Sequence, residues 1–132
     1  MRLWHQALIP HLPRQQLLGQ HRECCALRGL GWGKPHATVN YVFEHDQVKL
    51  YQYHIKVMME MNRRGYKTDT KWWRYSYRGQ KIPSEYQRES DPWTLEEAIL
   101  LKETIYPEHN DQYLKECLEN LAGKGIFLEV TL

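Results

Sequence analysis

The sequence has few of the features that mark membrane, secreted or repetitive proteins. None of its apolar runs approaches the roughly 18 residues that a membrane-spanning helix needs. The first twelve residues include His5, Gln6 and Pro10, where a signal peptide needs an unbroken apolar core. There is no internal repeat and no low-complexity tract. We therefore expect a cytoplasmic protein that does not enter a membrane.

Cysteine is also scarce. There are three, an odd number, and Cys24 and Cys25 are adjacent, which suits an ordinary disulfide bond poorly. We expect reduced thiols. His21 with Cys24 or Cys25 has the spacing of metal ligands on a helix, but no Cys-x-x-Cys or His-x-x-x-His pair completes a tetrahedral set. The sequence therefore predicts neither a metal ion nor a cofactor.

The spacing of apolar residues is mostly helical. With 132 residues, 42% of them hydrophobic and 26% charged, the chain suits one globular domain over residues 1–132. Apolar periodicity with proline, asparagine and glycine at the ends predicts helices at about residues 13–28, 46–64, 91–105 and 110–123. A glycine-rich loop is expected at 29–35, an irregular segment at 37–43, and an extended or looped excursion at 66–90. The predicted fold is an all-α, compact helical bundle with an aromatic and basic loop excursion.

A net charge of +2 conceals a marked asymmetry along the chain. The formal charge is +4 for residues 1–43, −1 for 44–61, +6 for 62–88 and −7 for 89–132. A polyanion would be attracted to the first 88 residues and repelled by the remainder, which favours contact with nucleic acid. The alternative is an ordinary solvated surface.

The most unusual local composition is the run from Lys71 to Arg78. It interleaves cations with aromatic side chains, among them Trp72, Trp73 and Arg74. Such a run offers stacking platforms for bases and partners for phosphates. Alternatively, the tryptophans fill the core while the basic residues face water.

Glu23 is the single acidic residue among the first 43. A lone carboxylate in a basic field is favoured in its ionised form, and beside DNA it could stabilise a positive, oxocarbenium-like sugar in a transition state. The competing interpretation is a solvated helix carboxylate that pairs with a neighbouring arginine such as Arg22.

Two stretches resemble one enzyme family. Leu12 to Glu23, with the adjacent Arg22 and Glu23, resembles the first long helix of the phage-type pyrimidine-dimer DNA glycosylase/AP lyase (endonuclease V-like) family. Met61 to Tyr66 resembles the basic, Arg-Gly-aromatic end of that family's central helix. The resemblance covers about the first half of the chain.

The resemblance implies a helical enzyme of base excision repair that acts as a monomer on kinked double-stranded DNA. Such an enzyme removes a damaged pyrimidine by attack of its N-terminal α-amine on the sugar C1′, forming an imine that permits strand cleavage. An α-amine, with a pKa near 7.7 to 8.0, offers more neutral nucleophile at pH 7 than lysine does. The resemblance makes Glu23 the catalytic acid and Arg22 a phosphate ligand.

The sequence departs from the family at its start. The family nucleophile is a threonine exposed by loss of the initiator methionine, whereas Arg2 stands there in this chain. Either the α-amine of Met1, one position before the family's threonine, acts as the nucleophile, or the imine step is altered or absent. The lesion is left open, and a non-catalytic nucleic-acid-binding module on the same scaffold is the alternative. The predicted catalytic residues are Glu23, Met1 and Arg2, and the predicted DNA-binding residues are Arg22, Arg28, Lys34, Lys71, Trp72, Trp73, Arg74 and Arg78.

Overall fold

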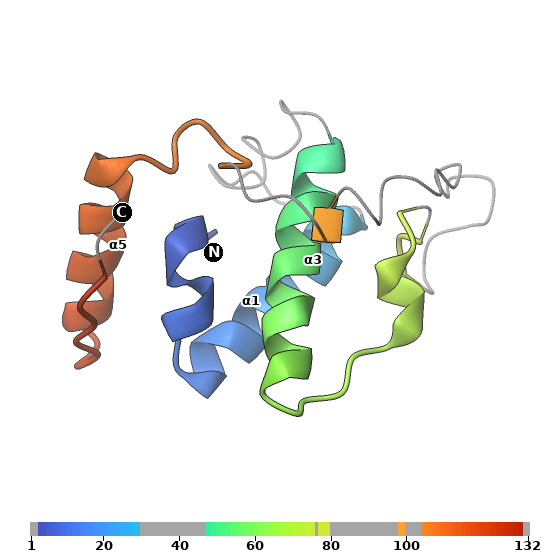
Figure 1. The fold of residues 1–132 in the computed structure, drawn as a ribbon, viewed down its shortest axis with the longest axis horizontal. Coiled ribbons are helices and arrows are strands. Elements are labelled where there is room, and N and C mark those ends of the chain that lie inside the picture. Colours follow the sequence, from blue (N-terminus) through green and yellow to red (C-terminus); the bar gives the residue numbers. More distant parts are fainter. Residues whose placement is uncertain (1–2, 30–46, 76, 80–97, 100–103, 131–132) are drawn as a thin grey trace.

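The described part of the chain is built from helices. The computed structural model describes residues 3–29, 47–75, 77–79, 98–99 and 104–130. Its elements are two 3-10 helices, η1 (Gln6–His11) and η2 (Thr70–Trp73), and three α-helices, α1 (Arg14–Arg28), α3 (Gln47–Arg63) and α5 (Asp111–Ala122). In the view of Figure 1, α5 and η1 lie on one side of α3 and η2 on the other. This architecture confirms the predicted all-α class.

The three α-helices confirm the predictions for residues 13–28, 46–64 and 110–123, each end to within one residue. Most of the helix predicted at 91–105 lies outside the described residues. Within it, Ala98 and Ile99 are helical, whereas Thr104 and Ile105 are not. The loop predicted at 29–35 is described at Gly29 alone, and the segment at 37–43 lies outside the described residues.

The end of α3 is set by Gly65. Its φ of 86° is a left-handed conformation that glycine adopts without strain, and the Tyr66 N–H donates to the Met61 carbonyl at 2.8 Å. At α5, the Asn110 side chain caps the first turn by accepting from the Tyr113 N–H. These are the glycine stop and asparagine start on which the sequence predictions relied.

The two 3-10 helices were not predicted. In η1, the His5 side chain accepts from the Ala7 N–H and starts a turn that buries Leu8 and Ile9. In η2, the Asp69 side chain does the same for the Lys71 N–H, so the expected extended or looped excursion is wrong at these four residues. Helices this short carry too few residues to show a period in the sequence.

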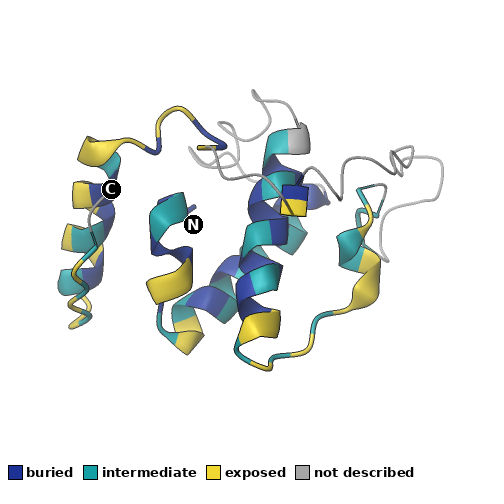
Figure 2. Ribbon diagram, viewed as in Figure 1, coloured by how far each residue is buried: buried dark blue, intermediate teal, exposed yellow. Residues whose placement is uncertain are grey.

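Helices α1 and α3 pack directly against one another, and α3 also contacts η1. Figure 2 shows buried residues along both α1 and α3, with the exposed residues in the described part of α3 confined to its last turn. Helix α5 joins the same core through Leu114, Cys117 and Leu121. A second, smaller apolar cluster lies where α3 meets η2 and consists of Tyr51, Ile55, Met58 and Ala98, with Met59, Trp72, Trp73 and Tyr75 against it.

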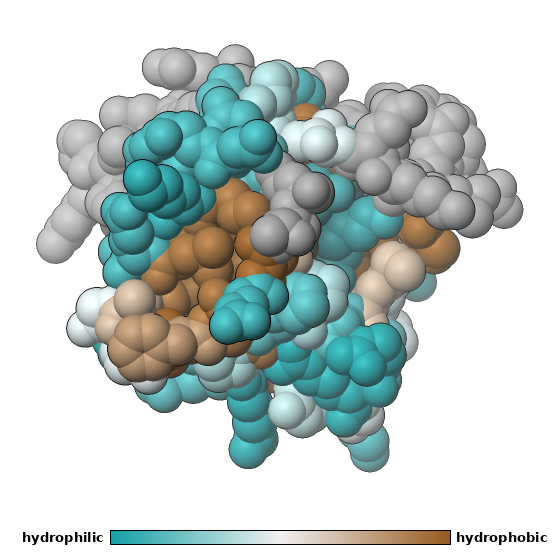
Figure 3. Space-filling model, turned by 60° about the vertical axis from the view of Figure 1, so that its left-hand side comes forward, coloured by the Kyte–Doolittle hydropathy of each residue, from teal (hydrophilic) through white to brown (hydrophobic). Residues whose placement is uncertain are grey.

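Part of the apolar interior is visible from outside. Figure 3, with the α5 side turned forward, shows hydrophobic side chains gathered in a hollow that hydrophilic residues border. Phe127, beyond α5, is 81% exposed. Among the described residues, no helix is both long enough and apolar enough to span a bilayer.

Candidate active site

Glu23 lies on α1 and is tied to the start of the chain through Gln20. The Gln20 Nε2 donates to the Glu23 Oε2 at 2.8 Å, and the Gln20 Oε1 accepts from the Trp4 backbone N–H at 2.7 Å. Gln20 and Glu23 share one face of α1 because they are three residues apart. One buried amide therefore connects the carboxylate of Glu23 to the fourth residue of the chain.

Helix α3 supports this connection with Tyr53. The Tyr53 hydroxyl lies 2.6 Å from the Trp4 carbonyl oxygen and 2.8 Å from the Gln20 Oε1. Its single proton can be donated to one of these two acceptors at a time. Tyr53 and Gln20 are 0% and 1% exposed, so water does not compete for these contacts.

The first described residues are firmly held. Leu3, Trp4 and His5 are buried, and the Tyr113 hydroxyl of α5 donates to the Leu3 carbonyl. His5 also stacks on His109 with 5.2 Å between ring centroids. Met1 and Arg2 lie outside the described residues, but the chain immediately after them is fixed against α1, α3 and α5.

The surroundings of Glu23 combine burial with positive charge. Burial raises the pKa of the Glu23 carboxyl, while the charges of the amino terminus, Lys124 and Arg22 act to lower it. The Lys124 Nζ lies 5.3 Å from the centroid of the Trp4 ring. A half-buried carboxylate with a raised pKa among cations is suited to proton transfer and to stabilising a cationic sugar.

The exposed side of α1 presents two guanidinium groups. A shallow pocket of about 360 Å³ is lined by Arg14, Gln15, Leu18 and Arg22. Both arginines are exposed, and the Arg14 guanidinium carbon lies 5.4 Å from the centroid of the Tyr66 ring. Arg22 was predicted to hold a phosphate, and this position leaves its guanidinium accessible to one.

Arg28, predicted to bind DNA, lies inside the protein. It is 2% exposed, and its guanidinium donates to the carbonyl oxygens of Trp72 (2.6 Å), Arg74 (2.6 Å) and Tyr77 (3.2 Å). A further bond joins its Nη1 to the Nδ1 of His54 at 3.0 Å. Arg28 thus anchors the aromatic and basic segment to the end of α1.

The remaining predicted DNA-binding residues differ in exposure. Lys71 and Arg74 are exposed, whereas Arg78 is half-buried and donates to the carbonyls of Arg28 and Gly29 at 3.1 and 2.9 Å. Lys34 lies outside the described residues.

The two tryptophans are half-buried against α3. The Trp73 Nε1 donates to the Thr68 Oγ1 at 3.0 Å, and the Trp72 ring meets Tyr77 edge-on at 4.7 Å. Both interpretations of this run, stacking platform and core filler, therefore stay compatible with its structure.

A histidine and cysteine cluster lies on another face of α1. Ligand atoms of His21, Cys25 and His54 all fall within 4.8 Å of one another, a geometry that could hold a metal ion. Because an arginine can only donate, the bond from Arg28 makes the His54 Nδ1 an acceptor, which leaves the proton on Nε2. That nitrogen lies 2.8 Å from the His21 Nδ1. A hydrogen-bonded chain thus accounts for the short distance between the rings without an ion.

Burial lowers the pKa of His54 well below its ordinary value, with further lowering by Arg28 and His21. Burial likewise raises the pKa of the Cys25 thiol to about 12. The rings are therefore neutral and the thiol protonated near pH 7, so Cys25 is a poor nucleophile.

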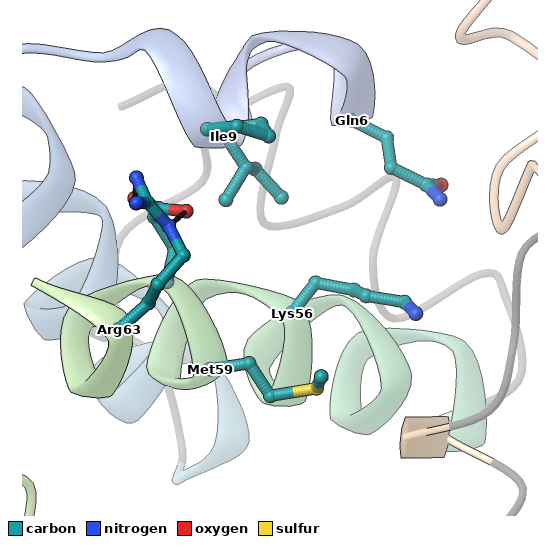
Figure 4. A pocket seen from close by; sticks show the side chains of 7 residues that line it. Gln6, Ile9, Lys56, Met59 and Arg63 are labelled. Carbon is teal, nitrogen blue, oxygen red and sulfur yellow. Dashed lines mark hydrogen bonds and ion pairs between the residues drawn. The ribbon is translucent and has the colours of Figure 1, made fainter.

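A groove of about 610 Å³ separates η1 from α3 and is lined by Gln6, Ile9, Pro10, Lys56, Met59, Glu60 and Arg63 (Figure 4). Ile9 and Met59 form its apolar middle, with the Arg63 side chain at one end and those of Gln6 and Lys56 extending toward the other. Glu60 is paired with Arg63 and Arg64. The acidic group of this groove is therefore already paired with two arginines.

The sequence was also compared with models of known protein families. The family model described as pyrimidine dimer DNA glycosylase matches residues 1–74, more than half of the chain. The chain belongs to the pyrimidine dimer DNA glycosylase family. No curated protein and no solved structure matched it.

The match to the glycosylase family confirms the resemblance and extends it over η1, α1, α3 and η2. It includes Gln20, Glu23 and Tyr53, whereas α5 and Lys124 lie beyond it.

Four residues were not predicted from the sequence: Gln20, Tyr53 and Lys124 around Glu23 and Trp4, and His54 in the cluster with His21 and Cys25. The spacing of Gln20 before Glu23 was a usable signal, since residues three apart on a helix are neighbours. Tyr53, His54 and Lys124 lie 26 or more residues away from their partners on α1 or at Trp4, and no local pattern marks such contacts. Packing of α1 on α3 brings the first two into place.

Proposed function

We propose that this chain is a DNA glycosylase that excises a damaged pyrimidine from double-stranded DNA. Glu23 is the catalytic carboxylate, and the α-amine at the start of the chain is the nucleophile. The observation that supports the proposal is the linkage from Glu23 through Gln20 to the backbone of Trp4, which stands three residues after Met1 in the sequence. Membership of the glycosylase family supports the same chemistry.

The reaction follows from these two groups. The neutral amine attacks the sugar C1′, forming a carbon–nitrogen bond while the glycosidic bond breaks and the base leaves with its electron pair and takes up a proton. The sugar passes through a cationic state, which an ionised Glu23 stabilises. Loss of a proton from the nitrogen and opening of the sugar ring give the imine, and removal of a C2′ proton then expels the 3′ phosphate. We assign the transfer of these protons to Glu23.

Contact with DNA falls to the exposed cations and the aromatic segment. Arg14 and Arg22 on α1, Lys71 in η2 and Arg74 directly after η2 are exposed and available to phosphates. The half-buried Trp72 is the residue that we assign to stacking on a base. Arg28 and Arg78 contribute indirectly, because their guanidinium groups hold the backbone of the aromatic segment to the end of α1.

A second candidate is a non-catalytic nucleic-acid-binding module. It is favoured by Arg2, which stands where the family resemblance places a nucleophilic threonine. This module would retain the exposed cations and lose turnover, so the two candidates differ in catalysis and not in binding.

The test compares Glu23→Gln with the unaltered protein on duplexes that each contain one lesion, such as a cyclobutane pyrimidine dimer, an oxidised pyrimidine or an abasic site. Glu23→Gln is expected to fold and bind DNA while single-turnover excision falls roughly 10²- to 10³-fold. Glu116→Gln, an exposed site on α5, is the matched control and should excise normally. If Glu23→Gln excises as fast as the unaltered protein, Glu23 is not the catalytic carboxylate. If the unaltered protein binds DNA but excises nothing, the non-catalytic binding module is supported.

A further inference from the structure

We propose that Gln20 is a positioning residue that couples the placement of the chain's first residues to the orientation of the Glu23 carboxylate. This inference rests on the proposed function and assigns a part of its site to a residue that does not itself react. Its basis is geometric: one side chain, 1% exposed, contacts the Trp4 backbone with one end and Glu23 with the other.

The orientation of the Gln20 amide is determined by its partners. The Trp4 N–H can only donate, so the atom 2.7 Å away must be the amide oxygen. The amide nitrogen then faces the Glu23 Oε2 and can only donate to it. Reversing the amide would oppose two donors at Trp4. Gln20 therefore stabilises the ionised form of Glu23 and fixes one of its two oxygens.

The bridge has little freedom to adjust. Tyr53 approaches both the Gln20 Oε1 and the Trp4 carbonyl oxygen from α3, so the amide oxygen is contacted from two sides in a buried space. A change in the path of the chain at Trp4 is thereby transmitted to the Glu23 oxygen through one rigid amide group. For a reaction between the α-amine and a sugar carbon beside Glu23, this fixes Trp4, three residues after Met1 in the sequence, relative to the carboxylate.

A purely structural role makes different predictions. If Gln20 only filled the core, its loss would lower stability without changing the titration of Glu23 or the pH dependence of turnover. A positioning role requires three changes together: loss of protection at the Trp4 amide, a shift in the Glu23 titration, and a fall in kcat larger than any change in KM.

The decisive variants are Gln20→Met and Gln20→Glu, with Gln16→Met as the control that makes the same chemical change one turn earlier on α1. Three measurements are made on each: hydrogen exchange at the Trp4 amide, the carboxyl pKa of Glu23 by carbon-13 NMR, and single-turnover excision against pH. Gln20→Met should speed Trp4 exchange, raise the Glu23 pKa and lower kcat about 100-fold, because small displacements of reacting groups have effects of that size.

Gln20→Glu tests the contact of residue 20 with Trp4 and its contact with Glu23 separately. Its carboxylate still accepts from the Trp4 N–H, so exchange there should stay slow. It places a second carboxyl beside Glu23, so the pair shares a proton and the acidic limb of the pH profile moves to higher pH. If Gln20→Met does not fold, this variant alone decides. The proposal would be overturned if, in Gln20→Glu, both the acidic limb of the pH profile of excision and the pKa of Glu23 stayed unchanged.

The failure of this inference and the failure of the proposed function are distinguishable. Amide exchange and the Glu23 pKa are measured without substrate. If both respond as expected but the unaltered protein excises nothing, the linkage stands and the glycosylase assignment fails. If the unaltered protein excises a lesion but neither property responds to Gln20 substitution, the assignment stands and the positioning role fails.

Discussion

Arg28 offers the sharpest stability prediction in the molecule. Its guanidinium is buried and donates to three backbone carbonyls, those of Trp72, Arg74 and Tyr77, and to His54. It also lies 5.1 Å from the centroid of the Tyr51 ring. The substitution Arg28→Met keeps an unbranched stem and removes every donor together with the positive charge.

The expected loss follows from these contacts. A hydrogen bond to a charged group contributes about 1.5 to 3 kcal/mol net, but four bonds to one group are not additive, and the unfolded state regains the hydration of the guanidinium. Breaking a buried charged network by removing one partner costs about 3 to 5 kcal/mol. For a chain of this size, that corresponds to a fall in Tm of roughly 10 to 20 °C.

The assay is urea unfolding and thermal melting of Arg28→Met beside Arg22→Met, the same change at an exposed site on the same helix. Arg22→Met should stay within about 0.5 kcal/mol of the unaltered protein. Equal stability of the two variants would refute the anchoring role of Arg28. If Arg28→Met instead folds normally and the slope of log DNA affinity against log salt falls by about one unit, Arg28 is a phosphate ligand.

Three further predictions follow from exposed and buried groups. Arg22→Ala and Arg74→Ala should each weaken DNA binding and flatten the slope of log affinity against log salt by about one unit. The measurement is a binding titration at several salt concentrations, and an unchanged slope would contradict the prediction. Trp72→Ala should cost about 1 to 3 kcal/mol of DNA binding if its ring stacks on a base, whereas a variant that only melts earlier, with normal binding in the cold, would assign Trp72 to the core. Burial lowers the pKa of His109 to about 4, with a further contribution from His5, so the unfolded chain takes up a proton that the folded chain does not. The stability contributed by neutral His109 should be complete above about pH 6.5 and fall by about 3 kcal/mol as the pH drops to about 4. His109→Gln should remove this part of the dependence in urea unfolding at pH 7 and 4.5, while the part that buried His54 contributes stays.

The main helices were predictable because their signals are local. The ends of α3 and α5 are set by Gly65 and Asn110, whose conformational and capping preferences act within one turn. The helices η1 and η2 were not predictable, since each depends on a single side-chain cap and on packing against α3.

In the candidate site, Glu23 could be singled out from the sequence, whereas its surroundings could not. The lone carboxylate and its arginine neighbour are visible in the sequence, whereas its link to Trp4 requires the packing of the chain's start on α1. Sequence spacing also cannot distinguish Arg28, whose guanidinium is buried, from Arg22, whose guanidinium is exposed, because both lie on one helix in a basic segment. The direction of a side chain relative to α3 decides between anchoring and DNA contact.

The central claim is that the α-amine at the start of the chain forms an imine with the sugar beside Glu23. It is tested most directly by incubating the protein with abasic or lesion-containing duplex and sodium borohydride, which reduces an imine to a stable amine, and then locating the adduct by proteolysis and mass spectrometry. The account predicts an adduct on the α-amine of Met1, or of whichever residue begins the mature chain, that prior acetylation of this amine abolishes. An adduct on a lysine such as Lys124, or excision with no adduct at all, would contradict it.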